Sequence, residues 1–175
     1  KEQEGQICVY GINAYYTELN TAKMLHDLNI SCKIDEKKIS RRMDKLGKHS
    51  GYELDELQKE AVVTAAGHGL LVLTGGPGTG KTTTINAMID YFDSEGLEVR
   101  LAAPTGRAAK RLEELSGLEA QTIHRLLGAS ISEDGESVIF KKNMSQPVDC
   151  EVVIVYECSM VDLALMKALL AAMRP

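Results

Sequence analysis

Residues 75–82 read GGPGTGKT, a complete G-x-x-x-x-G-K-T pattern. An apolar run, Leu70–Leu73, leads into the pattern, and Thr82–Phe92 follows it with apolar residues at helical spacing. Glycines let the backbone turn so that successive N–H groups point at phosphate oxygens, and the N-terminus of a helix adds partial positive charge. An ordinary turn between a strand and a helix requires neither the lysine nor the threonine. The stretch therefore predicts a nucleoside triphosphate site.

The pattern also predicts which residues contact the nucleotide. Lys81 would reach the β- and γ-phosphates and take part in catalysis, and the hydroxyl of Thr82 would bind Mg²⁺. The expected nucleotide-binding residues of the loop and the following turn are Gly75, Gly76, Pro77, Gly78, Thr79, Gly80, Lys81, Thr82 and Thr83.

Composition limits the classes of protein that fit this sequence. The 175 residues, 44% of them hydrophobic, suffice for one medium domain, or for a small domain with a helical appendage. The net charge of −5 argues against wholesale coating of nucleic acid, although it leaves room for a local basic groove. The apolar runs are far shorter than the roughly 20 residues of a membrane span. We therefore expect a soluble protein without a membrane partner.

Cysteine usage indicates the compartment. Four cysteines, at positions 8, 32, 150 and 158, show neither C-x-x-C spacing nor histidines at zinc-ligand distance. Free thiols in a reducing environment are the simplest interpretation, and they predict a cytoplasmic location.

The first 50 residues differ in character from the rest and are expected to form a helical accessory segment. Within them, Ala14–Leu28 has the apolar spacing of an amphipathic helix. The run Lys33–Lys48 is rich in lysine and arginine, and a solvated helix face is the favoured interpretation, with a contact to a DNA backbone as the sharper alternative. Gly47 and the Ser50-Gly51 pair indicate a linker, which places a domain boundary between residues 50 and 51.

From residue 54 onward, helical and strand patterns alternate, which predicts an α/β fold with a parallel sheet flanked by helices. A polar excursion over residues 129–149 contains Glu133-Asp134-Gly135 and Val138–Phe140, and predicts a hairpin. The expected helices are Leu54–Ala66, Thr82–Phe92, Gly106–Leu115 and Met160–Met173, and the expected strands are Leu70–Leu73, Glu98–Ala102 and Val152–Val155, the last of them buried on both faces.

Three further segments restrict the class of phosphate-loop protein. They are APTGRAA at 103–109, TIHR at 122–125, and VVIVYECSM at 152–160. Together with GGPGTGKTTT and the upstream Leu54–Gln58, these segments resemble the RecD-like DNA helicases of superfamily 1. The resemblance implies a RecA-like P-loop NTPase fold, with 51–175 as an incomplete first motor domain. It also implies ATP-dependent, 5′-to-3′ unwinding of duplex DNA in repair or recombination.

The resemblance assigns roles to individual residues. Gln58 matches the glutamine that reads adenine, so ATP with Mg²⁺ is the expected cofactor pair. Glu157 matches the catalytic glutamate that polarises the attacking water. The positions that match residues lying along single-stranded DNA are Pro104, Thr105, Arg107, Thr122 and His124. Thr105 would either cap the helix that follows it or bond a phosphate oxygen.

The sequence departs from the family pattern at Tyr156, where the family carries an aspartate that holds the Mg²⁺ shell. A neutral phenol does not replace a carboxylate as a ligand of a hard dication. We therefore expect nucleotide to bind while Mg²⁺-dependent hydrolysis is severely impaired. The chain also stops where the family continues toward a second motor domain with its arginine finger, so it is expected to need that domain as a partner and to be inactive alone.

Three alternatives stay open at this stage. A nucleotide-binding module that does not hydrolyse ATP would account for Tyr156. A small-molecule kinase would use the same phosphate loop, although APTGRAA and TIHR argue against it. A relaxase-linked helicase with a similar motor would differ only in domains outside this chain.

Overall fold

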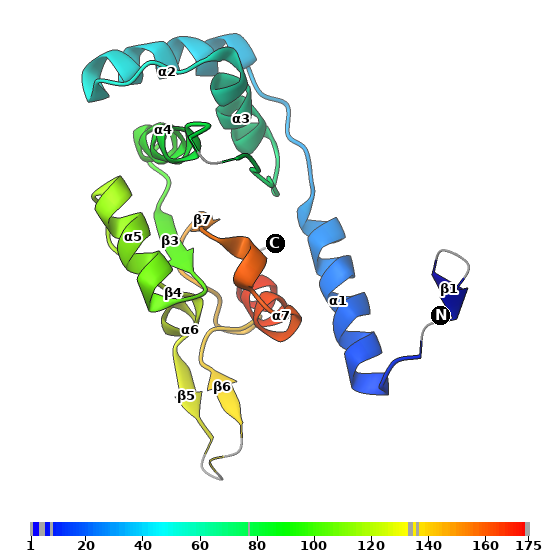
Figure 1. The fold of residues 1–175 in the computed structure, drawn as a ribbon. Coiled ribbons are helices and arrows are strands. Elements are labelled where there is room, and N and C mark those ends of the chain that lie inside the picture. Colours follow the sequence, from blue (N-terminus) through cyan, green and yellow to red (C-terminus); the bar gives the residue numbers. More distant parts are fainter. Residues whose placement is uncertain are drawn as a thin grey trace.

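The computed structural model describes residues 2–3, 6–7, 9–76, 78–132, 135 and 137–173 (Figure 1). Its centre is a parallel sheet in the order β4-β3-β7. The strands are β3 (Val99–Ala103), β4 (Ala120–Thr122) and β7 (Val152–Val155). Leu101 of the middle strand is paired with Ala120 on one side and with Ile154 on the other. The α/β class with a parallel sheet flanked by helices is confirmed.

Alternation along β3 divides the core between the two faces of the sheet. Leu101 belongs to a cluster with Ile85, Ile89 and Leu112, whereas its neighbour Ala102 belongs to a cluster with Leu165. Successive side chains of a strand point to opposite faces. One face is therefore covered by α4 (Lys81–Ser94) and α5 (Gly106–Ser116), and the other by α6 (Ile123–Leu126) and α7 (Leu163–Ala172).

A third apolar cluster joins α4 to the helices that precede the phosphate loop. It combines Ile39 and Met43 of α2 (Glu36–Ser50), Val62 of α3 (Glu56–Gly67), and Met88 and Phe92 of α4. Figure 1 shows α2 and α3 above α4, on the side away from the sheet. The division of the chain at residue 50 stays a prediction, but α2 packs into the same core as the helix that carries the phosphate loop.

The N-terminal segment contributes two further features. Strands β1 (Glu2–Gln3) and β2 (Gln6–Ile7) pair antiparallel, and α1 (Ile12–Leu28) approaches α7. Within α1 only Thr21 is buried, where its hydroxyl donates to the carbonyl of Thr17. The helix expected over Ala14–Leu28 is present, but Leu19 and Ala22 of its expected apolar face are exposed, so its amphipathic character stays a prediction.

The predicted hairpin is present as β5 (Ala129–Ile131) and β6 (Val138–Phe140), which pair antiparallel and project from the rest of the fold (Figure 1). Of its expected turn, Glu133 and Asp134 lie outside the described residues. Cys32, Cys150 and Cys158 are free thiols, whereas Cys8 lies outside the described residues. Among the helices that the structure describes, none is long and apolar enough to cross a membrane.

The strand expected at Leu70–Leu73 is absent, because these residues form no ladder with a described strand. Leu71 and Leu73 pack on core clusters while Val72 is 75% exposed. The apolar residues in this run indicate that side chains are buried in alternation. An extended segment can bury them in this way without forming hydrogen bonds to a neighbouring strand. The prediction of a strand was therefore wrong, although Leu71 and Leu73 lie half-buried against the core clusters.

Two other expectations are corrected. Val152–Val155 is half-buried along its length rather than buried on both faces, because β7 is an edge strand of the sheet. The last helix begins at Leu163, after a 3₁₀ turn at Cys158–Met160, because the carboxylate of Asp162 caps it by accepting from the N–H of Leu165 at 2.8 Å. The short elements β4 and α6 were not foreseen.

Candidate nucleotide and DNA-contact site

The phosphate loop runs directly into the first turn of α4. Gly78 and Gly80 have φ of 76° and 74°, in the left-handed region that favours glycine, and Gly80 is the N-cap of α4. The hydroxyl of Thr79 donates to the carbonyl of Gly76 at 2.9 Å, which closes the turn. Pro77 lies outside the described residues. The loop conformation thus depends on its glycines, as the sequence pattern predicts.

Lys81 folds back over this loop. Its ammonium donates to the carbonyls of Gly75 and Gly76, with both N···O distances at 2.5 Å. An ammonium held over the loop lies where the negative charge of a bound phosphate is stabilised. Thr82 and Thr83 follow in the first turn of α4, and both are half-buried.

The loop offers the donors that a triphosphate requires. Among the described residues, the N–H groups of Gly78, Thr79 and Gly80 donate to no backbone acceptor. N–H groups in a glycine-rich turn at a helix N-terminus can form an anion-binding concavity. These residues, together with Lys81, fit a nucleotide phosphate chain.

Gln58 touches the last glycine of the loop. Its Nε2 donates to the carbonyl of Gly80 at 3.4 Å, and its Oε1 accepts from the N–H of Asp55 at 3.0 Å. The second contact belongs to a capping box that starts α3, in which Asp55 also accepts from the N–H of Gln58. The cap fixes this glutamine beside the loop, although 22 residues separate it from Gly80 in the chain.

Position 156 is occupied by Tyr156, which does not supply a carboxylate for Mg²⁺. Tyr156 is half-buried and packs against the apolar cluster of Ile85, Ile89, Leu101 and Leu112, which also receives Leu73. Among the described residues, no group of three or more His, Cys, Asp or Glu side chains could hold a metal ion. Of the two expected metal positions, Thr82 offers a hydroxyl oxygen and Tyr156 offers a phenol in place of a carboxylate.

Glu157, the expected catalytic residue, has an unusual backbone conformation. Its φ of 58° and ψ of 45° make it the one described non-glycine residue in the left-handed region. Its side chain is exposed, and its carbonyl accepts from the N–H of Met160 at 3.2 Å. Such a conformation costs about 1–2 kcal/mol, and backbone strain of this kind clusters at functional sites.

The first expected DNA-contact segment follows β3. Pro104 and Thr105 are half-buried, and the hydroxyl of Thr105 caps α5 by accepting from the N–H of Ala108 at 3.2 Å. The capping role predicted for Thr105 is thus confirmed. Arg107, in the first turn of α5, is exposed, so its guanidinium is accessible to a phosphate.

The second expected DNA-contact segment follows β4. The hydroxyl of Thr122 caps α6 by accepting from the N–H of Arg125 at 3.2 Å. His124 is exposed, and its ring lies 6.0 Å from that of Phe140, between centroids, at the base of the β5–β6 hairpin. Thr105 and Thr122 therefore have the same structural role, each starting the helix that follows its strand.

All three strand-end segments lie at one edge of the sheet. Because β4, β3 and β7 are parallel neighbours, their carboxyl ends meet at the same edge, where α/β folds bind ligands. Thr122 is the last residue of β4, and Thr105 and Glu157 lie two residues beyond β3 and β7, so the sheet places residues up to 52 positions apart at one edge.

Sequence reasoning missed two side-chain anchors of α4. Asp90 accepts from the hydroxyls of Ser50 and Tyr52, at 2.9 and 3.0 Å. Ser94 accepts from Nε of Arg42 at 2.8 Å. Arg42 belongs to the cationic run Lys33–Lys48. The sequence pattern alone does not distinguish this arginine, which anchors α4, from the exposed cations around it.

Comparison with known proteins identifies the family. A family model described as an AAA domain matches residues 58–175. The chain is 50% identical over 122 residues to the ATP-dependent RecD2 DNA helicase of Deinococcus radiodurans, covering 70% of this chain and 16% of that protein. It is 38% identical over 143 residues to the RecBCD enzyme subunit RecD of Mycolicibacterium smegmatis, covering 69% and 25%.

A more distant similarity extends to a phage protein. The chain is 40% identical over 107 residues to the ATP-dependent DNA helicase dda of Enterobacteria phage T4, covering 60% of this chain and 24% of that protein. The chain thus spans about a quarter or less of the length of these curated relatives. The resemblance predicted from the motifs is confirmed, and the chain belongs to the AAA domain family as a RecD-like member.

Proposed function

We propose that this chain is the ATP-binding motor domain of a RecD-like DNA helicase, which couples ATP hydrolysis to translocation on single-stranded DNA and to unwinding in repair or recombination. The observation that carries the proposal is the shared sheet edge. Thr105, Thr122 and Glu157 lie at or just beyond the carboxyl ends of three adjacent parallel strands. Leu73, before the phosphate loop, and Tyr156, after β7, pack on the same cluster.

Each residue has a defined task in this proposal. Gln58 contacts the base, the loop N–H groups and Lys81 bind the phosphates, and Glu157 holds the attacking water. Arg107 binds a phosphate of the DNA strand, with Pro104, Thr105, Thr122 and His124 beside it. A bound Mg²⁺, held through Thr82, would neutralise charge developing on the phosphates.

Some expectations from the resemblance stay predictions. They are the 5′-to-3′ direction and the need for a second motor domain as a partner. The cytoplasmic location expected from the cysteines also stays a prediction. One relative is named as an ATP-dependent DNA helicase, and another is named as a subunit of the RecBCD enzyme. Further protein partners are therefore compatible with the proposal.

Binding of single-stranded DNA tests the proposal and separates it from a small-molecule kinase. Fluorescence anisotropy of a labelled oligonucleotide, with and without ATP, should show binding that depends on nucleotide. Arg107→Ala should weaken binding about tenfold, as expected for a charge-assisted contact of roughly 1.5 kcal/mol. Lys23→Ala, an exposed cation on α1, is the matched control and should bind as the parent does. Absence of DNA binding by the parent chain would contradict the proposal.

A second candidate function is favoured by the packing of Tyr156. This side chain is part of the core at the position where the family pattern requires a metal-binding aspartate. In a nucleotide-binding module that does not hydrolyse ATP, the nucleotide would stabilise one conformation or one partner interface. Such a module would bind ATP tightly and show no Mg²⁺-dependent turnover, even in the presence of single-stranded DNA.

A further inference from the structure

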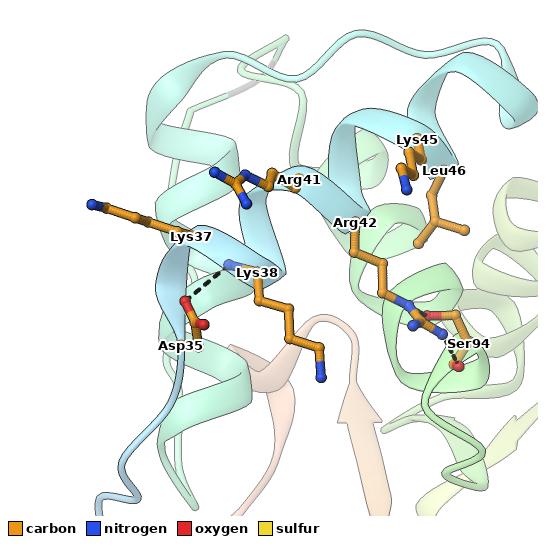
Figure 2. Close-up of a pocket in the computed structure, with 8 residues that line it drawn as sticks. All are labelled: Asp35, Lys37, Lys38, Arg41, Arg42, Lys45, Leu46 and Ser94. Atoms are coloured by element: carbon orange, nitrogen blue, oxygen red, sulfur yellow. Dashed lines mark hydrogen bonds between the residues drawn. The ribbon is translucent and has the colours of Figure 1, made fainter.

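A groove between α2 and the end of α4 is lined by basic side chains (Figure 2). It has a volume of about 660 Å³ and lies at Ser94, the last residue of α4. The phosphate loop adjoins the first residue of the same helix, about 20 Å away at 1.5 Å per residue. The lining residues are Asp35, Lys37, Lys38, Arg41, Arg42, Lys45, Leu46 and Ser94.

The positive charge of this groove is largely uncompensated. Lys37, Lys38, Arg41 and Lys45 are exposed, and none of them forms an ion pair with another described residue. The single lining carboxylate, on Asp35, caps α2 by accepting from the N–H of Lys38. In a chain with a net charge of −5, this concentration of cations is a local reversal of sign.

The cations are held in place by the fold. The opposite face of α2 is buried through Ile39 and Met43, so the basic side of the helix is fixed toward solvent. Arg42 spans the groove wall, donating from Nε to the hydroxyl of Ser94 and from its terminal nitrogen to the Ser94 carbonyl. Figure 2 shows Lys38 extending to the same side of α2 as Arg42.

The spacing suits a linear polyanion. Lys38 and Arg42, like Arg41 and Lys45, are four residues apart, which places neighbouring cations about 5–6 Å from one another along the helix. A row of cations in a groove matches closely spaced charges along one line, which is the charge distribution of a nucleic-acid backbone. Arg42 is paired with the carboxylate of Glu95 at 3.2 Å. Lys38, Arg41 and Lys45 have no carboxylate partner among the described residues, which leaves these three available for phosphates.

We propose that this groove binds the phosphodiester backbone of DNA, as a second contact remote from the strand-end edge of the sheet. The choice of nucleic acid as the polyanion rests on the proposed function. The contact is independent of base sequence, because lysine and arginine on phosphates carry no sequence information. It would hold either single-stranded or duplex DNA against α2 while the strand-end edge of the sheet contacts a separate DNA strand.

The test compares two double variants with the same change of charge. Lys38→Gln/Lys45→Gln removes two groove cations, and Lys23→Gln/Lys141→Gln removes two exposed cations from α1 and the region after β6. Binding of the full chain to a single-stranded oligonucleotide and to a duplex of the same length is measured by anisotropy over a series of salt concentrations. Circular dichroism checks that each variant keeps the parent's helix content and melting temperature.

We expect the groove variant to lose about tenfold or more in affinity and about 2 in the slope of log K against log salt, one for each lost phosphate contact. The control variant should keep the parent's slope. A loss confined to the duplex identifies duplex DNA as the ligand, and a loss with both probes identifies the shared backbone chemistry. Either result supports the proposal.

Three outcomes would overturn it. They are parental binding by the groove variant, an equal loss in the control variant, or binding of poly-glutamate that matches DNA affinity and requires Lys38 and Lys45. Arg107→Ala separates this proposal from the motor function. Weaker binding by Arg107→Ala with an unaffected groove variant would reject the groove alone, and the reverse pattern would reject the motor contact alone.

Discussion

The side-chain amide of Gln58 lies against the carbonyl of Gly80, with Nε2 and O 3.4 Å apart, and a Cβ added to Gly80 would approach that nitrogen to 2.3 Å. Gly80 also has φ of 74°. The start of the phosphate-loop helix therefore depends on glycine for its conformation, and an added Cβ would displace the end of the Gln58 side chain. The same contact ties α3 to the nucleotide site.

Gly80→Ala should lower the free energy of unfolding by more than the strain of a left-handed backbone conformation alone. Strain at positive φ costs about 1–2 kcal/mol, and displacement of Gln58 adds to it. Gly96→Ala is the matched control, because Gly96 has φ of 77° with nothing within 4 Å of an added Cβ. Urea unfolding of both variants measures the difference, and equal losses would show that the contact with Gln58 is irrelevant to stability.

Lys81→Ala should weaken ATP binding about tenfold or more, because it removes a charge-assisted contact worth roughly 1.5–3 kcal/mol. Calorimetric titration with ATP measures the loss, and thermal unfolding without nucleotide checks the fold. Lys110→Ala, on the exposed side of α5, provides the comparison. If the Lys81→Ala variant binds ATP as tightly as the parent, the loop is not part of the nucleotide site.

In the parent-length protein, Tyr156→Asp should raise Mg²⁺-dependent ATP hydrolysis about a hundred- to a thousandfold, the range typical of a single preorganised charge-stabilising group. The substitution also exchanges a packed phenol for a carboxylate, so a lower melting temperature is expected. Tyr156→Asn is the control for loss of packing without gain of charge. Equal turnover by the parent and Tyr156→Asp would mean that position 156 does not hold the metal.

Glu157→Gly should raise the free energy of unfolding by about 1 kcal/mol, because glycine adopts the observed φ of 58° without the steric cost of a Cβ. Turnover should fall with the loss of the carboxylate. Glu157→Gln separates the two effects, since it retains the strain and removes the charge. A less stable glycine variant would show that the side chain contributes more to folding than its exposure indicates.

The pKa of Tyr52 is raised above its usual value of about 10, first by burial and then by the hydrogen bond and charge of Asp90. A raised pKa means that the folded protein binds this proton more tightly than the unfolded chain. The contribution of Tyr52 is therefore fully present below about pH 10 and is lost as pH rises beyond that value. Tyr52→Phe should flatten this alkaline decline in unfolding experiments, and an unchanged pH profile would contradict the assignment.

The accuracy of the sequence predictions follows from what each pattern measures. The loop at residues 75–82 encodes its own conformation through glycine and lysine, so its form could be predicted. The helical spacing of the apolar residues in 82–92 likewise predicts which face of α4 is buried. Leu70–Leu73 shows the opposite case, because alternating burial does not specify whether a neighbouring strand is present.

Contacts between distant segments were beyond the reach of the sequence. Arg42 and Ser94 are 52 residues apart, and Tyr52 and Asp90 are 38 apart. Neither pair belongs to a local motif, so only the folded chain shows which of the many cations and hydroxyls are anchors. The strand-end residues could be assigned only through the family resemblance, and their adjacency at one sheet edge became visible once the strand order was known.

The two anchors of α4 have a mechanical consequence. Asp90 and Ser94 fasten the last turns of this helix to Tyr52 and Arg42, while its first turn carries Lys81. Because α4 begins at Lys81 and is hydrogen-bonded near its other end to Arg42 and Ser50 of α2, we expect a tilt of α4 at the loop to be passed on to α2.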